Sequence, residues 1–199
     1  RDMTSPEGAF YAATDADSLT PAGHREEGYF FTWTPAELQQ ALGADLFRIV
    51  AAYYIDGPTP NFEGRYILNT PRPCQEVAAQ LGMDVPDFQK TVESSKAILR
   101  ETRSQRPSPL RDEKILADWN GLMIAALARG ARVTGNPDYS AAASRAARFI
   151  LGDMLTSEGR LLHRYRDGEA AIPGYLDDYA FLIWGLIELY EATFEANWL

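Results

Sequence analysis

The stretch Ile115-Leu116-Ala117-Asp118-Trp119 returns at an offset of 60 residues as Tyr175-Leu176-Asp177-Asp178-Tyr179, and each copy opens a long apolar segment. A period of this length holds two helices with their connections, which is typical of stacked helical hairpins. Either an open superhelical solenoid or a closed α/α toroid fits such a repeat. The polar and aromatic residues at the starts of the apolar segments, together with small hairpins inserted between helices, favour the toroid.

Four long helical patterns alternate in character along the second half of the chain. Segments 86–106 and 137–150 carry one apolar stripe each, which predicts outer helices covered on one side. Segments 114–133 and 176–194 are apolar on nearly every face, which predicts inner helices buried all round. Six such hairpins need about 360 residues. We therefore predict an all-α fold with small β-hairpin insertions, in which residues 1–199 form a single segment of a partial (α/α)6 toroid.

Short strands are expected in two parts of the chain. Runs 8–11 and 28–33 are rich in aromatic residues and strand-like, and a polar loop over 15–27 separates them. Segment 160–168 alternates in polarity and ends in Asp-Gly, which predicts a β-hairpin between two helices. These strands are the only regular structure that we expect besides helices.

The helices of the first half have clear start and stop signals. Thr34 and Glu37 have the spacing of a capping box, and Gly43 is placed to end that helix. A second helix is expected over 45–54, and a short one over 75–81.

Composition and charge exclude several classes of partner. The chain is 46% hydrophobic and 24% charged, as in ordinary globular proteins. Its net charge of −9 argues against nucleic acid and anionic membranes as partners. The single cysteine, Cys74, forbids an internal disulfide, and no apolar run reaches the ~20 residues of a membrane span, so a cytoplasmic location is expected. The start at Arg1 and the end at Leu199, directly after a helical pattern, indicate a segment of a larger polypeptide.

Polar residues at the inner-helix starts are the candidates for chemistry, because these starts would face the central cavity of a toroid. Asp178, Asp177 and Asp118 are predicted as catalytic carboxylates, with Asp178 as the general acid/base. Carboxylates framed by aromatic rings suit sugar chemistry. Helix capping alone also favours carboxylates at these positions, and it is the favoured interpretation for Asp177. The residues predicted to bind a substrate are Trp119, Asn120, Tyr175, Tyr179, Lys114, Asp15 and Asp17.

Several of these residues also have ordinary structural interpretations. Asp15 and Asp17 lie in a loop, where a role in an Asx turn is favoured over a cation site. Lys114 follows two acidic residues and could form a surface ion pair with one of them. His24 and His163 are isolated in the sequence, without a second histidine at helical spacing, so neither a metal site nor a cofactor is expected.

Blocks of sequence distributed along the chain resemble the helical part of a thioredoxin-domain-containing family that includes the spermatogenesis-associated thioredoxin-like proteins. The most specific blocks are 119–127 and 174–181. The others are Thr4-Ser5-Pro6-Glu7-Gly8, Phe10-Tyr11, Asp15-Ala16-Asp17-Ser18, Phe31-Thr32-Trp33-Thr34, Asn61-Phe62-Glu63-Gly64 and Lys114-Ile115-Leu116. Where the family usually shows Asp-Asp-Lys, this chain has Asp112-Glu113-Lys114, which preserves the charge.

The resemblance implies an α/α toroid similar to six-hairpin glycosidases and N-acylglucosamine 2-epimerases, preceded by a thioredoxin-like domain that lies outside this chain. A carbohydrate-active or sugar-binding module is therefore the expected function, with a small carbohydrate as ligand. The alternative is a non-catalytic scaffold that recognises a protein for the thioredoxin-like domain. In either case we expect the rest of the polypeptide or a second copy to cover the open sides of the inner helices.

Overall fold

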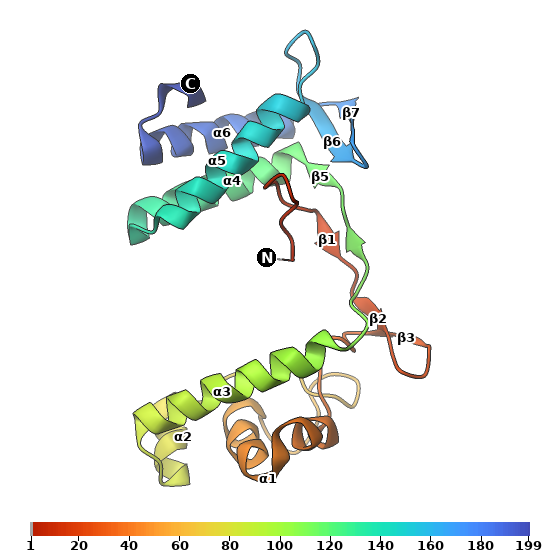
Figure 1. The fold of residues 1–199 in the computed structure, drawn as a ribbon, viewed down its shortest axis with the longest axis vertical. Helices are drawn as coiled ribbons and strands as arrows, with labels where there is room; N and C mark the ends of the chain where they lie inside the picture. The colour runs from red at the N-terminus through yellow and green to blue at the C-terminus, as the bar shows by residue number, and fades with distance from the viewer. Residues whose placement is uncertain (1) are drawn as a thin grey trace. The chain divides into compact units, whose positions relative to one another are not determined.

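The computed structural model describes residues 2–199, which form two compact units (Figure 1). One unit combines residues 2–14 with residues 111–199, and the other is Asp15–Leu110. Helices dominate both units, as predicted, but three small antiparallel sheets mean that the fold is not purely all-α. Closure of the helices into a ring, and a single segment over residues 1–199, stay predictions.

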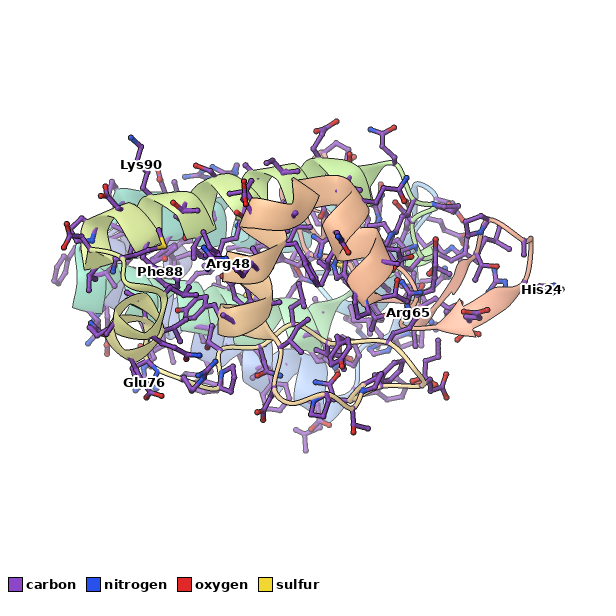
Figure 2. All side chains as sticks on the ribbon, turned by 90° about the horizontal axis from the view of Figure 1, so that it is seen from below. His24, Arg48, Arg65, Glu76, Phe88 and Lys90 are labelled. Carbon is purple, nitrogen blue, oxygen red and sulfur yellow. The ribbon has the colours of Figure 1, made fainter. Side chains whose placement is uncertain are left out.

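The unit Asp15–Leu110 is built on three helices that enclose two apolar clusters. Leu38 and Val50 of α1 lie in one cluster, and Phe88 of α3 lies in the other together with Val77 of α2. Figure 2 shows Phe88 pointing from its helix toward α2. The helices are α1 (Pro35–Tyr54), α2 (Cys74–Leu81) and α3 (Val85–Ser104).

The capping box that begins α1 is present as predicted. The Thr34 hydroxyl accepts a hydrogen bond from the Glu37 backbone N–H at 3.2 Å, and the Thr34 N–H donates to the Glu37 carboxylate at 2.7 Å. Gly43 interrupts the helix with φ 73° and ψ 171°, a conformation that favours glycine. The prediction of two consecutive helices meeting at Gly43 is therefore confirmed.

The aromatic run 28–33 forms a turn instead of the expected strand, because it wraps around two arginines. The Thr32 N–H donates to the Gly28 carbonyl at 3.0 Å, and Arg106 donates to the Thr32 carbonyl at 2.7 Å. The Arg106 guanidinium also lies 4.0 Å from the centre of the Trp33 ring. Run 8–11 likewise contains only an isolated β-bridge. The strands lie instead within the expected polar loop, where β2 (Asp17–Leu19) pairs with β3 (Arg25–Glu27).

We call Glu37, Arg65 and Arg106 the guanidinium clasp. The Arg65 guanidinium donates to the Glu37 carboxylate at 2.6 Å, and that of Arg106 lies 3.6 Å from it. Burial raises the pKa of the Glu37 carboxyl, but the hydrogen bonds from Arg65 and Thr34 and the two positive charges outweigh it. The net effect is a pKa below the ordinary value of 4.5. Burial also lowers the pKa of Arg106 from its ordinary value.

In the unit of residues 2–14 and 111–199, the helices α4 and α6 run parallel and side by side (Figure 1). The backbone N–H of Asp118 at the start of α4 bonds to Asp178 at the start of α6, and Arg132 pairs with Glu188 near their ends. Helix α5 packs against α4 and completes a helical hairpin. The bounds are α4 (Ala117–Thr134), α5 (Pro137–Asp153) and α6 (Leu176–Thr193), followed by the short 3-10 helix η1 (Ala196–Trp198).

Two glycines let α4 and α6 approach closely. A Cβ atom at Gly121 would lie 2.5 Å from the carbonyl carbon of Phe181, and one at Gly185 would lie 2.6 Å from the carbonyl oxygen of Gly121. Any larger residue at Gly121 would therefore push the two backbones apart.

The prediction that both inner helices are buried on every face is wrong in this structure. Each has a face that no other part of the described chain covers, and Met123 of α4 and Ile183 of α6 are 42% and 53% exposed. These exposed side chains form a surface that we call the open face, which consists of Trp119, Leu122, Met123, Ile183, Trp184 and Ile187.

A three-stranded antiparallel sheet lies at the start of α4. The predicted hairpin is present as β6 (Leu162–Arg166) and β7 (Glu169–Pro173), with Asp167 and Gly168 at positive φ in the turn. Strand β6 also pairs with β5 (Ile115–Leu116), which leads directly into α4. The first residues of the chain are attached through β1 (Ala13–Thr14) and β4 (Arg111–Asp112).

Among the described residues, no helix combines the length and the apolar character that crossing a membrane requires.

Candidate functional site

The candidate site is centred on Asp178, in the first turn of α6. Its side chain is 1% exposed, and its Oδ2 accepts a hydrogen bond from the Tyr175 N–H at 2.7 Å. This contact is the helix cap that the sequence offered as an alternative to a catalytic role. It fixes the carboxylate at the start of the helix.

The same carboxylate also connects the two repeats. Its Oδ1 accepts a hydrogen bond from the Asp118 N–H at the start of α4, at 3.0 Å. The side chain of Asp118 is partly exposed and bonds to the next N–H along the chain, that of Trp119, at 2.8 Å. One buried carboxylate thus satisfies a backbone donor in each of two neighbouring helices.

The third contact of Asp178 is with His163 on β6. The Nδ1 atom of His163 lies 2.9 Å from Oδ1 and 3.0 Å from Oδ2. We assign the ring proton to Nδ1, since a carboxylate can only accept, and in the neutral imidazole this leaves the lone pair on Nε2. Within residues 2–199, no group is hydrogen-bonded to Nε2. The His163 side chain is 23% exposed.

This geometry gives the two residues different chemical capacities. The Asp178 oxygens accept from two backbone N–H groups and from His163, which leaves them little capacity to exchange a proton with a ligand. Nε2 of His163 has a lone pair that can accept a proton from a ligand. His163 is therefore the better candidate for proton transfer, and Asp178 holds its ring in place.

Asp118, His163 and Asp178 could also contribute to a cation site. Each offers a ligand atom, and these atoms lie within 4.8 Å of one another. The sequence did not predict a metal, because the three residues come from separate segments. A cation between them would compete with the proton that His163 donates to Asp178 and with the backbone donors on its oxygens.

Aromatic rings predicted to bind a substrate lie beside this cluster. The ring of Tyr175 is 61% exposed and meets that of His163 edge-on, with the centroids 5.2 Å apart. Trp119 follows Asp118 and is 51% exposed. Tyr179 is partly engaged, because its hydroxyl accepts a hydrogen bond from the Leu161 N–H at 3.0 Å.

Two other predicted residues near the cluster have different environments. Asp177 is exposed. Asn120 is 1% exposed and bonds only to backbone, donating to the Phe10 and Leu116 carbonyls at 2.9 Å and accepting from the Phe10 N–H at 2.8 Å. Asn120 therefore anchors the N-terminal segment to α4, and we leave it out of the proposed site.

The remaining predicted residues are not part of the cluster. Lys114 forms the expected surface ion pair, with Asp112 at 3.1 Å. Asp15 and Asp17 belong to the other unit, where Asp15 accepts from the Asp17 N–H at 3.2 Å, as in the favoured Asx-turn interpretation. Asp15 also pairs with Arg25 at 3.1 Å.

His163 is the residue that sequence reasoning missed. It is isolated in the sequence, and the pairing of β6 with β5 is what carries it to the helix starts. One signal was present, since the predicted hairpin directly precedes the second copy of the repeat.

Comparisons with known proteins identify relatives of this chain. It is 31% identical to human spermatogenesis-associated protein 20 over 100% of this chain and 29% of that protein. It is 32% identical to an uncharacterised protein of Caenorhabditis elegans over 99% of this chain and 30% of that protein. The mouse spermatogenesis-associated protein 20 is 30% identical over the whole of this chain.

The structural comparison gives a more distant likeness. The cellobiose 2-epimerase from Bacillus thermoamylovorans matches 99% of this chain and 47% of its own, with a TM-score of 0.41 and 11% identity. No protein-family model matches the chain. The chain spans about three tenths of the length of the curated relatives that it matches. It is homologous to that part of them, which confirms the predicted resemblance to the helical part of the spermatogenesis-associated proteins.

Proposed function

We propose that the starts of α4 and α6 form a site for a carbohydrate-type ligand, in which His163 is the general base and Asp178 orients it. The proposal rests on the buried Asp178 carboxylate, which accepts a hydrogen bond from Nδ1 of His163. The other ring nitrogen, Nε2, makes no hydrogen bond within residues 2–199. Histidine held by a carboxylate in this way is suited to proton transfer near neutral pH, which contributes about 10²–10⁴-fold to a rate.

The neighbouring aromatic rings support a sugar as the ligand. Trp119 lies in the first turn of α4 and Tyr175 directly precedes α6, and both expose more than half of their surface. The apolar faces of sugar rings can pack against such rings while their hydroxyls bond to polar groups. The partly exposed Asp118 offers a carboxylate oxygen within 4.8 Å of the ligand atoms of His163 and Asp178, and this carboxylate could accept such a bond.

The geometry favours epimerase-like over glycosidase-like chemistry. Glycosidases use two carboxyl groups, about 5–9.5 Å apart, that both act on the glycosidic bond. Here one of the two carboxylates, Asp178, is committed to backbone donors and His163. A single free base suits removal of a proton from the carbon next to a carbonyl group and its return to that carbon. That is one half of an epimerisation, and the other half needs a proton donor on the opposite face of the sugar.

Deuterium exchange in the full-length protein tests this proposal. Wild-type protein in D2O is incubated with hexoses, N-acylhexosamines and uronic acids, and NMR follows binding and deuterium entering the sugar. We expect His163→Gln to reduce deuterium incorporation at least 100-fold, since the base is lost. His24→Gln, which replaces the other, exposed histidine, is the matched control and should leave the rate unchanged. Equal rates in both variants would disprove the role of His163.

The open face favours a second candidate function, a non-catalytic scaffold that packs against another part of the longer polypeptide. Its adjacent apolar side chains belong to a chain that spans only about three tenths of its relatives. We propose that the rest of the longer polypeptide covers this face. The 199-residue chain should then bind a hydrophobic dye that the full-length protein does not bind. A dimer that dissociates on Ile183→Glu but not on Val133→Glu would instead show that a second copy covers the face.

A further inference from the structure

A pocket in the unit Asp15–Leu110 has a lining that the proposed function does not use. Its volume is about 270 Å³, near the lower end of ligand pockets. Its apolar wall includes Phe31, Trp33, Tyr54 and Leu99. Aromatic walls of this kind fit a small planar or aliphatic group.

The charged part of the lining comes from α3. Lys96, Arg100 and Arg103 stand four and then three residues apart, which places them on one face of the helix. All three line the pocket, and none of the described residues that line it is acidic. A wholly positive lining contrasts with the net charge of −9 of the chain.

Two of these three charges form no ion pair within residues 2–199, although the Glu93 carboxylate is close enough to interact with the Arg100 charge. Lys96 forms an ion pair with Glu93 at 2.5 Å. Arg100 and Arg103 make no ion pair with any of residues 2–199. The Arg103 guanidinium instead lies 5.6 Å from the centre of the Phe31 ring, which holds it beside the pocket by a cation–π contact.

Tyr54 adds a polar group to the same wall. Burial raises the pKa of its phenol above the ordinary value of 10.0, although the Lys96 charge opposes this. The hydroxyl is therefore protonated at neutral pH and can donate a hydrogen bond to an acceptor.

We infer that this pocket binds a small organic anion, a carboxylate or phosphate monoester on a single aromatic or short aliphatic body. Arg100 and Arg103 would bind the anionic group, because a guanidinium fork matches carboxylate and phosphate oxygens. The apolar body would pack against Trp33 and Phe31. The pocket and the site at His163 share no residue, so either proposal can fail without the other.

Three probes separate the two parts of the inference. Phenyl phosphate carries the anion and the ring, inorganic phosphate carries only the anion, and benzyl alcohol carries only the ring. Each is titrated into the full-length protein, with calorimetry for affinity and the Trp33 indole N–H signal in NMR for location. We expect phenyl phosphate to bind at least tenfold more tightly than either partial probe, and less tightly as salt is raised.

Variants then test the assigned residues. Arg100→Gln and Arg103→Gln should each lower the affinity for phenyl phosphate about tenfold, since each removes a charge-assisted contact. Arg103→Lys keeps the charge but removes the guanidinium fork, so it should bind phenyl phosphate more weakly than wild type and more tightly than Arg103→Gln. Lys90→Gln on α3 is the matched control, because Lys90 lies outside the pocket lining and points away from the unit in Figure 2.

Two results would overturn the inference. One is the absence of a phenyl phosphate effect on the Trp33 signal in folded wild-type protein. The other is an affinity that is equal in Lys90→Gln and in both pocket variants, with thermal unfolding showing that all are folded.

Discussion

At the scale of single residues, the buried carboxylate of Asp178 has a structural role as well as the proposed one. Its oxygens satisfy the N–H groups of Tyr175 and Asp118, so Asp178→Ala would leave both donors without that partner. We expect this variant to lower the free energy of unfolding by about 2–4 kcal/mol. Asp177→Ala, at the exposed neighbouring position, should cost less than about 1 kcal/mol. Urea unfolding of the two variants measures the difference, and similar losses would contradict the structural role.

The guanidinium clasp makes a pH-dependent contribution to stability. The pKa of Glu37 is lower in the folded chain than its ordinary value of 4.5, so the unfolded chain binds the proton more tightly. The stabilisation is therefore present above pH 4.5 and is lost as the pH falls through the lower folded value. We expect wild type to have a higher Tm than Glu37→Gln at pH 7 and the difference to shrink toward pH 3. A difference that stays constant over this range would contradict the assignment.

The sequence predicted which single residues lie close together only where the repeat placed them at equivalent positions. Asp118 and Asp178 were paired by the offset of 60, and the structure connects them by a hydrogen bond. His163 could not be found in this way, because strand pairing and not helical spacing brings it to Asp178. Whether these residues act on a substrate stays a prediction.

At the scale of elements, the close contact of α4 and α6 depends on Gly121. Its replacement by alanine would place Cβ 2.5 Å and 2.6 Å from backbone atoms of Phe181 and Leu182. We expect Gly121→Ala to destabilise the fold by about 1–3 kcal/mol, the usual cost of overpacking. Gly152→Ala in α5 is the control, since its Cβ would meet nothing within 4 Å. That change should raise the free energy of unfolding by up to about 1 kcal/mol. Thermal unfolding shows whether each variant is less or more stable than wild type.

Helices were predicted more accurately than strands for a physical reason. Capping signals such as Thr34 and stop signals such as Gly82 act locally, so they can be read from the sequence. The aromatic run 28–33 has strand propensity, but its rings pack on arginines that come from distant positions, Arg65 and Arg106. Tertiary contacts of this kind override propensity and are invisible to a local pattern.

At the scale of the whole molecule, the net charge of −9 and the pI of about 4.7 predict the behaviour toward polyanions. We expect no binding of duplex DNA or RNA at physiological salt, since binding requires a basic surface that releases counterions. Fluorescence anisotropy with labelled duplexes tests this at pH 7. Binding that disappears in Arg100→Gln would show instead that the cationic pocket lining dominates over the overall charge.

The hydrogen bond between Asp118 and Asp178 also has a consequence for the order of events during protein synthesis. The donor precedes the acceptor by 60 residues, and His163 lies between them. At ~5–20 residues per second, the start of α4 waits about 3–12 s on the ribosome for the carboxylate that caps it. The growing chain therefore carries an uncapped α4 and a histidine without its partner until α6 begins to emerge. The hydrogen bonds of Asp178 to Asp118 and His163 can form only after residue 178 has been synthesised.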